Sequence, residues 1–123
     1  MDWSEKKILI AEDEETNFLL LVEYLEPTSI QIFRAKNGLE VFEILKDTLP
    51  DLILLDIKMP KLTGFEVIIK LRALNITIPV IAQTAYTMVG DREKILTSGF
   101  DDYIPKPIDE DLLLTKMEKY LNL

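Results

Sequence analysis

Leu52-Ile53-Leu54-Leu55-Asp56 is the stretch of sequence that decides the fold. Four consecutive aliphatic residues, bounded by Pro50-Asp51 before them and Met59-Pro60 after them, are typical of a strand buried on both faces. Such strands belong to parallel sheets that helices cover on both sides. Asp56 falls at the carboxyl end of this strand, the edge where ligands bind in open α/β sheets. The pattern makes Asp56 a candidate nucleophile or metal ligand.

Length and composition limit the classes of function. At 123 residues the chain fits one domain, residues 1–123. It contains no cysteine and no histidine, which excludes disulfides, the usual zinc sites and any Ser-His-Asp set. A net charge of −8 repels nucleic acid phosphates, so we expect no nucleic acid partner. No apolar run approaches the ~18 residues that cross a bilayer, and the start lacks a signal peptide's apolar centre. We therefore expect no membrane contact and a cytoplasmic location.

Short β-rich runs alternate with segments of helical periodicity along the chain. The predicted strands are residues 7–11, 29–35, 52–56, 79–84 and 102–104. The predicted helices span residues 15–25, 37–48, 63–74 and 89–98, and a last one follows Asp109. This alternation predicts an α/β fold, a doubly wound (βα)5 sandwich around a parallel five-stranded sheet in the order 2-1-3-4-5.

Polar side chains follow four of these strands. Glu12-Asp13 comes after the first, Asp56 ends the third, Thr84 ends the fourth and Lys106 follows the fifth. In the predicted order the first and third strands are neighbours, so their three acids would meet in one crevice. Three close carboxylates repel one another unless a cation neutralises them. Their oxygens suit Mg²⁺, and Mn²⁺ is the alternative, so the sequence predicts a metal site there.

These residues carry a resemblance to a known family over essentially the whole chain. The matching text is Ile10-Ala11-Glu12-Asp13-Glu14, Leu55-Asp56-Ile57-Lys58-Met59-Pro60 with Gly64, Thr84-Ala85, and Asp102-Tyr103-Ile104-Pro105-Lys106-Pro107. It resembles the response-regulator receiver domain, the phospho-acceptor module of two-component signalling. The resemblance implies a flavodoxin-like fold. It also implies that the isolated domain is no enzyme beyond its own phosphorylation and dephosphorylation.

The resemblance implies a role for each acid. Asp56 would take a phosphoryl group from a phosphohistidine, and Glu12 and Asp13 would hold Mg²⁺ together with Asp56 and the backbone carbonyl of Lys58. Phosphoryl transfer depends mainly on positioning and on neutralising oxygen charge, which such a site can supply. The donor partner would be a histidine kinase or a histidine phosphotransfer domain.

Three further site residues are a lysine, a threonine and a tyrosine. Lys106 would neutralise the phosphoryl group, and its bond to Pro107 is expected to be cis. Thr84 would donate a hydroxyl and, with Tyr103, act as the switch for a surface made by helix 89–98, strand 102–104 and the last helix. We expect the partner to bind that surface, which could also form a weak homodimer.

Three positions narrow or depart from the family pattern. Lys58 and Tyr86 occupy the two sites where the family tunes the access of water to the acyl phosphate, and a bulky Tyr86 predicts slow self-dephosphorylation. Gln83 stands where the family usually has an apolar residue. Its amide therefore needs a hydrogen-bond partner, or this strand end is less buried than predicted.

Alternatives remain open at this stage. Residues 81–88 and 90–94 are similar to receivers attached to hybrid histidine kinases, which favours an origin in such a protein over a stand-alone regulator. A flavodoxin-like electron carrier is disfavoured because the acids after the first strand would repel a cofactor phosphate. An aspartyl phosphatase is disfavoured by Lys58, where a second acid is usual. The nearer rival is a pseudo-receiver, an interaction module that is never phosphorylated.

Overall fold

Five parallel strands form one sheet in the computed structural model, which describes residues 1–85 and 89–122. The strands are β1 (Lys7–Ala11), β2 (Gln31–Ala35), β3 (Leu52–Asp56), β4 (Val80–Thr84) and β5 (Asp102–Pro105). Their order across the sheet is β2-β1-β3-β4-β5, and every neighbouring pair is parallel. The predicted order is therefore confirmed, and it makes β1 and β3 neighbours.

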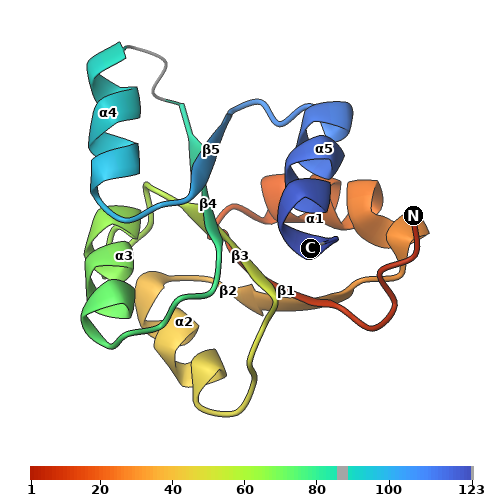
Figure 1. The fold of residues 1–123 in the computed structure, drawn as a ribbon, viewed down its shortest axis with the longest axis horizontal. Coiled ribbons are helices and arrows are strands. Elements are labelled where there is room, and N and C mark those ends of the chain that lie inside the picture. Colours follow the sequence, from red (N-terminus) through yellow and green to blue (C-terminus); the bar gives the residue numbers. More distant parts are fainter. Residues whose placement is uncertain (86–88, 123) are drawn as a thin grey trace.

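Helices cover both faces of this sheet. They are α1 (Glu15–Leu25), α2 (Gly38–Leu45), α3 (Gly64–Ala73), α4 (Val89–Thr97) and α5 (Glu110–Leu121). Figure 1 shows α1 and α5 on one face and α2, α3 and α4 on the other. Among these described elements, the predicted doubly wound (βα)5 sandwich with a flavodoxin-like fold is confirmed.

The chain path differs from prediction at the start of β2, which begins at Gln31 rather than at Ser29, and in two further details. A short 3₁₀ helix that the sequence pattern did not predict, η1 (Glu26–Thr28), follows α1 directly and contains Pro27. Helix α2 ends at Leu45 rather than near residue 48. The Asp47 and Thr48 N–H groups both donate to the Ile44 carbonyl, so the chain leaves α2 through a tightened turn.

The sheet separates two hydrophobic cores. All five residues of β3 are buried, as its uninterrupted apolar run predicted. Strand residues alternate between the cores, because successive side chains point to opposite faces. The core under α2, α3 and α4 contains Leu9, Ile53, Leu55, Val67, Leu71 and Ile95, whereas the core under α1 and α5 contains Ile10, Leu21, Leu52, Leu54, Leu113 and Met117.

Side-chain caps begin three of the helices where the sequence predicted them. Asn37 accepts from the Glu40 N–H at the start of α2, and Asp109 accepts from the Leu112 N–H at the start of α5. Thr63 and Glu66 form a capping box at the start of α3. These caps fix where each helix leaves the sheet edge that carries the site.

Helix α3 begins in direct contact with the end of β3. A Cβ atom added at Gly64 would lie 2.6 Å from the carbonyl oxygen of Asp56 and 2.7 Å from the Cα atom of Ile57. The Gly64 N–H donates to the Ile57 carbonyl at 2.8 Å. Only a residue without a side chain fits this approach, so Gly64 holds α3 against the site.

One arginine joins the loops at the opposite edge of the sheet. The Arg72 guanidinium donates to the carbonyls of Gly99, Ile76 and Ile78 at 2.8 to 3.0 Å, and it pairs with Asp101 at 2.9 Å. It thus connects α3 to the chain that enters β4 and β5.

Within residues 1–85 and 89–122, no helix has the length and apolar character to cross a membrane.

Candidate functional site

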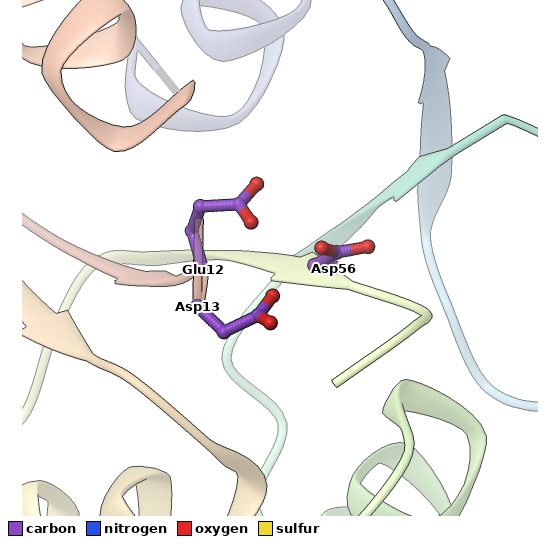
Figure 2. A group of neighbouring side chains, drawn as sticks. All are labelled: Glu12, Asp13 and Asp56. Atoms are coloured by element: carbon purple, nitrogen blue, oxygen red, sulfur yellow. The ribbon is translucent and has the colours of Figure 1, made fainter. Parts of the chain in front are cut away.

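Three acids gather at the carboxyl ends of β1 and β3. Glu12 and Asp13 follow β1, and Asp56 is the last residue of β3. Each offers an oxygen atom, and these oxygens lie within 4.8 Å of one another. Figure 2 shows the Asp13 carboxylate pointing toward Asp56. Glu12 and Asp56 are buried and Asp13 is exposed, so the cluster opens to solvent on the Asp13 side.

Lys106 supplies the positive charge of this cluster. It follows β5, and its Nζ atom lies 2.9 Å from Oδ2 of Asp56 and 3.5 Å from Oε1 of Glu12. The bond from Lys106 to Pro107 is cis, as expected. The backbone N–H of Lys106 donates to the Thr84 carbonyl at 2.8 Å, which fixes the lysine relative to β4.

The pKa values of Asp56 and Lys106 are both raised, but for different reasons. Burial raises the pKa of Asp56 from 3.8 to about 6, and the Glu12 charge adds to this rise, although the hydrogen bond and charge of Lys106 act against it. Burial alone would lower the pKa of Lys106, but its contacts with Asp56 and Glu12 raise it above 10.5. An ion pair alone would lower the acid's pKa, but for Asp56 the effect of burial outweighs that of Lys106. For Lys106 the contacts with the two acids outweigh the effect of burial.

A small pocket adjoins the Asp56 carboxylate. Its volume is about 40 Å³, and its lining includes Asp56, Lys58, Thr84, Ala85 and Lys106. A water molecule needs at least about 10 to 15 Å³ of such space, so the pocket admits a small polar group rather than a larger metabolite. The structure therefore brings Thr84, at the end of β4, to the same pocket as Asp56 and Lys106.

The other predicted site residues lie around this centre. The Lys58 N–H donates to Oδ1 of Asp56 at 3.1 Å, while the role of the Lys58 carbonyl stays a prediction. The Tyr103 ring on β5 has two cations near it, with the Arg92 guanidinium carbon of α4 at 5.6 Å and the Lys116 Nζ atom of α5 at 5.2 Å from its centroid. Tyr86 lies outside the described residues, so its predicted effect on dephosphorylation stays a prediction.

Sequence reasoning gave no site role to Asn17 of α1. Its amide nitrogen donates to Oε1 of Glu12 and, at 3.1 Å, to Oε1 of Gln83. Gln83 is fully buried, so the expectation that its amide requires a partner is met for the oxygen. The position of Asn17 in the first turn of a helix that begins beside two acids was the available signal, but its helical face alone did not reveal these contacts.

The donor set fits a hard divalent cation. Three carboxylates converge, and Lys106 is the cation that the described ion pairs place among them. Carboxylate oxygens are preferred ligands of Mg²⁺, which keeps several waters and uses one or two acids. Glu12, Asp13 and Asp56 are thus the residues that could hold it, and the exposed Asp13 leaves the approach open.

The family model of the response regulator receiver domain matches residues 8–118, so the chain belongs to this family. Receiver domains act in two-component signalling, interact with histidine kinases or histidine phosphotransfer proteins and generally bind Mg²⁺ at an acidic pocket. The fold, with its acids at the ends of β1 and β3, agrees with this assignment.

Relatives cover nearly the full length of the chain. The polar-differentiation response regulator DivK of Brucella anthropi is 38% identical over 118 residues, which cover 94% of this chain and 96% of DivK. The Ssk1 receiver domain of Saccharomyces cerevisiae, solved with the histidine phosphotransfer protein Ypd1, has a TM-score of 0.89 and 29% identity, covering 95% of this chain and 89% of that one. The receiver domain of sensor histidine kinase PA1611 from Pseudomonas aeruginosa, solved with a magnesium ion in its active site cleft, has a TM-score of 0.86 and 27% identity, covering 96% and 98%.

Proposed function

We propose that the protein is a phospho-acceptor of a two-component phosphorelay and that Asp56 receives the phosphoryl group. The observation that carries this proposal is the position of the Asp56 carboxylate, which ends the central strand, contacts Lys106 at 2.9 Å and borders a pocket shared with Thr84. A carboxylate oxygen attacks phosphorus and forms an O–P bond. The N–P bond of the phosphohistidine breaks, and its electron pair returns to the imidazole nitrogen.

The chain's own groups orient and stabilise this transfer. The Lys58 N–H and the Lys106 ammonium hold the two oxygens of Asp56, so the carboxylate faces the pocket in a fixed orientation. Lys106 also neutralises charge on the transferred oxygens, and the Thr84 hydroxyl donates to one of them. Asp56 reacts as a carboxylate, and its pKa of about 6 keeps it ionised at neutral pH.

Glu12, Asp13 and Asp56 would hold Mg²⁺, with the backbone carbonyl of Lys58 as a further ligand and Mn²⁺ as a substitute ion. When bound, the ion supplies positive charge for the phosphoryl oxygens. The PA1611 receiver supports this proposal, because its magnesium lies in the active site cleft of a similar fold.

The output surface is proposed to be α4, β5 and α5. A phosphoryl group adds negative charge and strong acceptors, which draw the Thr84 hydroxyl and the Lys106 ammonium toward Asp56. Thr84 and Lys106 are joined through a backbone hydrogen bond between β4 and the chain after β5, so both strand ends respond together. Tyr103 is the proposed second switch residue, because its ring contacts one cation of α4 and one of α5. The same surface is the proposed site of a weak homodimer.

We propose a histidine kinase or a histidine phosphotransfer domain as the donor, which the Ssk1 receiver solved with Ypd1 supports. An origin in a hybrid histidine kinase is supported by the PA1611 receiver, whereas DivK is itself a response regulator. A single domain over residues 1–123, a cytoplasmic location and the lack of nucleic acid or membrane partners stay predictions from the sequence.

The test is to incubate the protein with Mg²⁺ and acetyl phosphate and to measure its intact mass. One added phosphate is expected, lost in Asp56→Asn and kept in Asp47→Asn, a control at an exposed aspartate before β3. In this assay acetate replaces imidazole as the leaving group. No added phosphate on the wild type, with acetyl phosphate or with a phosphorylated histidine phosphotransfer domain, would favour the pseudo-receiver. A phosphate that persists in Asp56→Asn would assign the acceptor elsewhere.

A further inference from the structure

Glu12 is a buried glutamate whose carboxylate is held by neighbouring groups. Its Oε2 atom accepts from the Glu14 N–H at 3.1 Å, and its Oε1 atom accepts from the amide nitrogen of Asn17 and lies 3.5 Å from Lys106 Nζ. A glutamate has one more rotatable bond than an aspartate, so its carboxylate loses more conformational freedom when it is fixed. Something in the fold must hold Glu12 if it is to serve as a metal ligand.

The hydrogen bonds behind Glu12 have a forced direction. An ionised carboxylate only accepts, so Asn17 must present its amide nitrogen to Glu12. The same nitrogen donates to Oε1 of Gln83 at 3.1 Å, so Gln83 must present its oxygen to Asn17. Gln83 is the neighbour of Asp56 across the β3 and β4 pairing. The bridge thus runs from β4 through α1 to the acid after β1.

This arrangement has an energetic cost at Gln83. Its Nε2 atom is buried and has no hydrogen-bond partner among the described residues. Leaving a buried donor unpaired is unfavourable, because the group has lost its hydrogen bonds to water. An apolar side chain of similar size at this position would avoid the cost. The hydrogen bond to Asn17 is the one that the described residues give the Gln83 side chain. Any benefit of a glutamine at this position should therefore come through that bond.

We propose that Asn17 and Gln83 are positioning residues that fix the Glu12 carboxylate for Mg²⁺ binding. The inference rests on the proposed metal site and extends it to two residues outside the acid cluster. Asn17 holds Glu12 directly, and Gln83 holds Asn17. The unpaired Gln83 amide lowers the stability of the fold, while the hydrogen bonds through Asn17 hold the Glu12 carboxylate in one orientation. A residue with a merely structural role would show the opposite pattern, because its loss would lower stability and leave metal affinity unchanged.

The experiment compares Gln83→Met with the wild type by two measurements. Backbone amide shifts are followed by NMR during a MgCl₂ titration at constant ionic strength, and urea unfolding is measured in EDTA. The loss of one net hydrogen bond predicts a dissociation constant for Mg²⁺ that is higher by about 2- to 12-fold. The urea midpoint in EDTA is expected not to fall. Gln31→Met, the same change at an exposed glutamine of β2, is the control and should alter neither quantity.

Two further variants test the path of the effect. Asn17→Ala removes the direct donor to Glu12 and should weaken Mg²⁺ binding at least as much as Gln83→Met. In a Glu12→Asp background the shorter acid no longer reaches Asn17, so adding Gln83→Met should change the dissociation constant no further. Because Asn17 is only partly buried, Asn17→Ala keeps the inference testable if Gln83→Met does not fold.

The outcomes separate this inference from the proposed function. Equal dissociation constants for the wild type, Gln83→Met and Asn17→Ala would overturn the positioning role and leave the phospho-acceptor proposal intact. A lower urea midpoint with unchanged Mg²⁺ affinity would assign the bridge a structural role and overturn the inference as well. A wild type whose amide shifts do not respond to Mg²⁺ would overturn both the metal site and the bridge.

Discussion

Replacing Asp56 by asparagine should stabilise the protein at neutral pH in the absence of Mg²⁺. In the wild type Asp56 is only 3% exposed, and its pKa is raised from 3.8 to about 6. One pKa unit corresponds to about 1.36 kcal/mol, so ionising Asp56 in the folded protein costs about 3 kcal/mol. Asparagine has nearly the same size and carries no charge. The variant should therefore gain up to about 3 kcal/mol in free energy of unfolding.

The pH dependence identifies the cause. Between pH 3.8 and about 6 the folded wild type binds more protons at Asp56 than the unfolded chain does. Its free energy of unfolding therefore falls as the pH rises through this range, and the penalty is complete above it. The advantage of Asp56→Asn should be absent near pH 4, grow up to pH 6 and stay constant to pH 8. Lys106 stays protonated throughout, because its pKa is raised above 10.5.

The assay is urea unfolding in EDTA at several pH values and constant ionic strength. With slopes of about 1 to 3 kcal/mol/M for small proteins, the expected shift in midpoint at pH 7.5 is about 1 to 3 M. Asp47→Asn, at an exposed aspartate, should leave the midpoint unchanged. Addition of Mg²⁺ should raise the wild-type midpoint more than that of Asp56→Asn. A variant that is less stable than the wild type, or a difference independent of pH, would refute the reasoning that buried charge at Asp56 is costly.

Substitutions at three positions outside the acid cluster test how the fold supports the site, each by urea unfolding. Arg72→Met should lower the free energy of unfolding by about 2 to 4 kcal/mol, because it removes the guanidinium that donates to three carbonyls. Arg72→Lys should recover less than half of that loss. Equal stability of Arg72→Lys and the wild type would contradict the role of the guanidinium. Gly64→Ala should cost about 1 to 3 kcal/mol through overpacking against the end of β3, and a neutral result would show that this contact can relax. Thr63→Ala should cost about 1 kcal/mol by removing the α3 cap, whereas Thr63→Ser should be nearly neutral.

The fold was predictable because its signals are local. Single elements are specified by short features of the sequence, namely the apolar run before Asp56, the helix caps at Asn37 and Thr63 and the polar residues at the strand ends. A parallel sheet then fixes which strand ends meet. The end of α2 was less predictable. Its last turn depends on which carbonyl accepts from two successive backbone N–H groups, and the side-chain pattern does not determine this.

The site was predictable only as far as residue type and position carry it. Asp56, Lys106 and the acids after β1 could be placed because strand order brings them together. The contacts of Asn17 could not, since they depend on the rotation of α1 and on side-chain torsions. Gln83 gave a partial signal, because a buried amide requires a partner, but the sequence could not tell which group would supply it.

The close seam between Gly64 and the Asp56 carbonyl also gives the site a direction. Backbone meets backbone there without an intervening side chain, so that flank has almost no free space into which to move. On the other flank, Lys106 contacts the carboxylate through its side chain and Thr84 lines the same pocket, and side chains can change torsion at little cost. A chemical change at Asp56 therefore meets rigid backbone packing on the α3 side and movable side chains toward β4 and β5. The structural change that follows should extend toward β4 and β5.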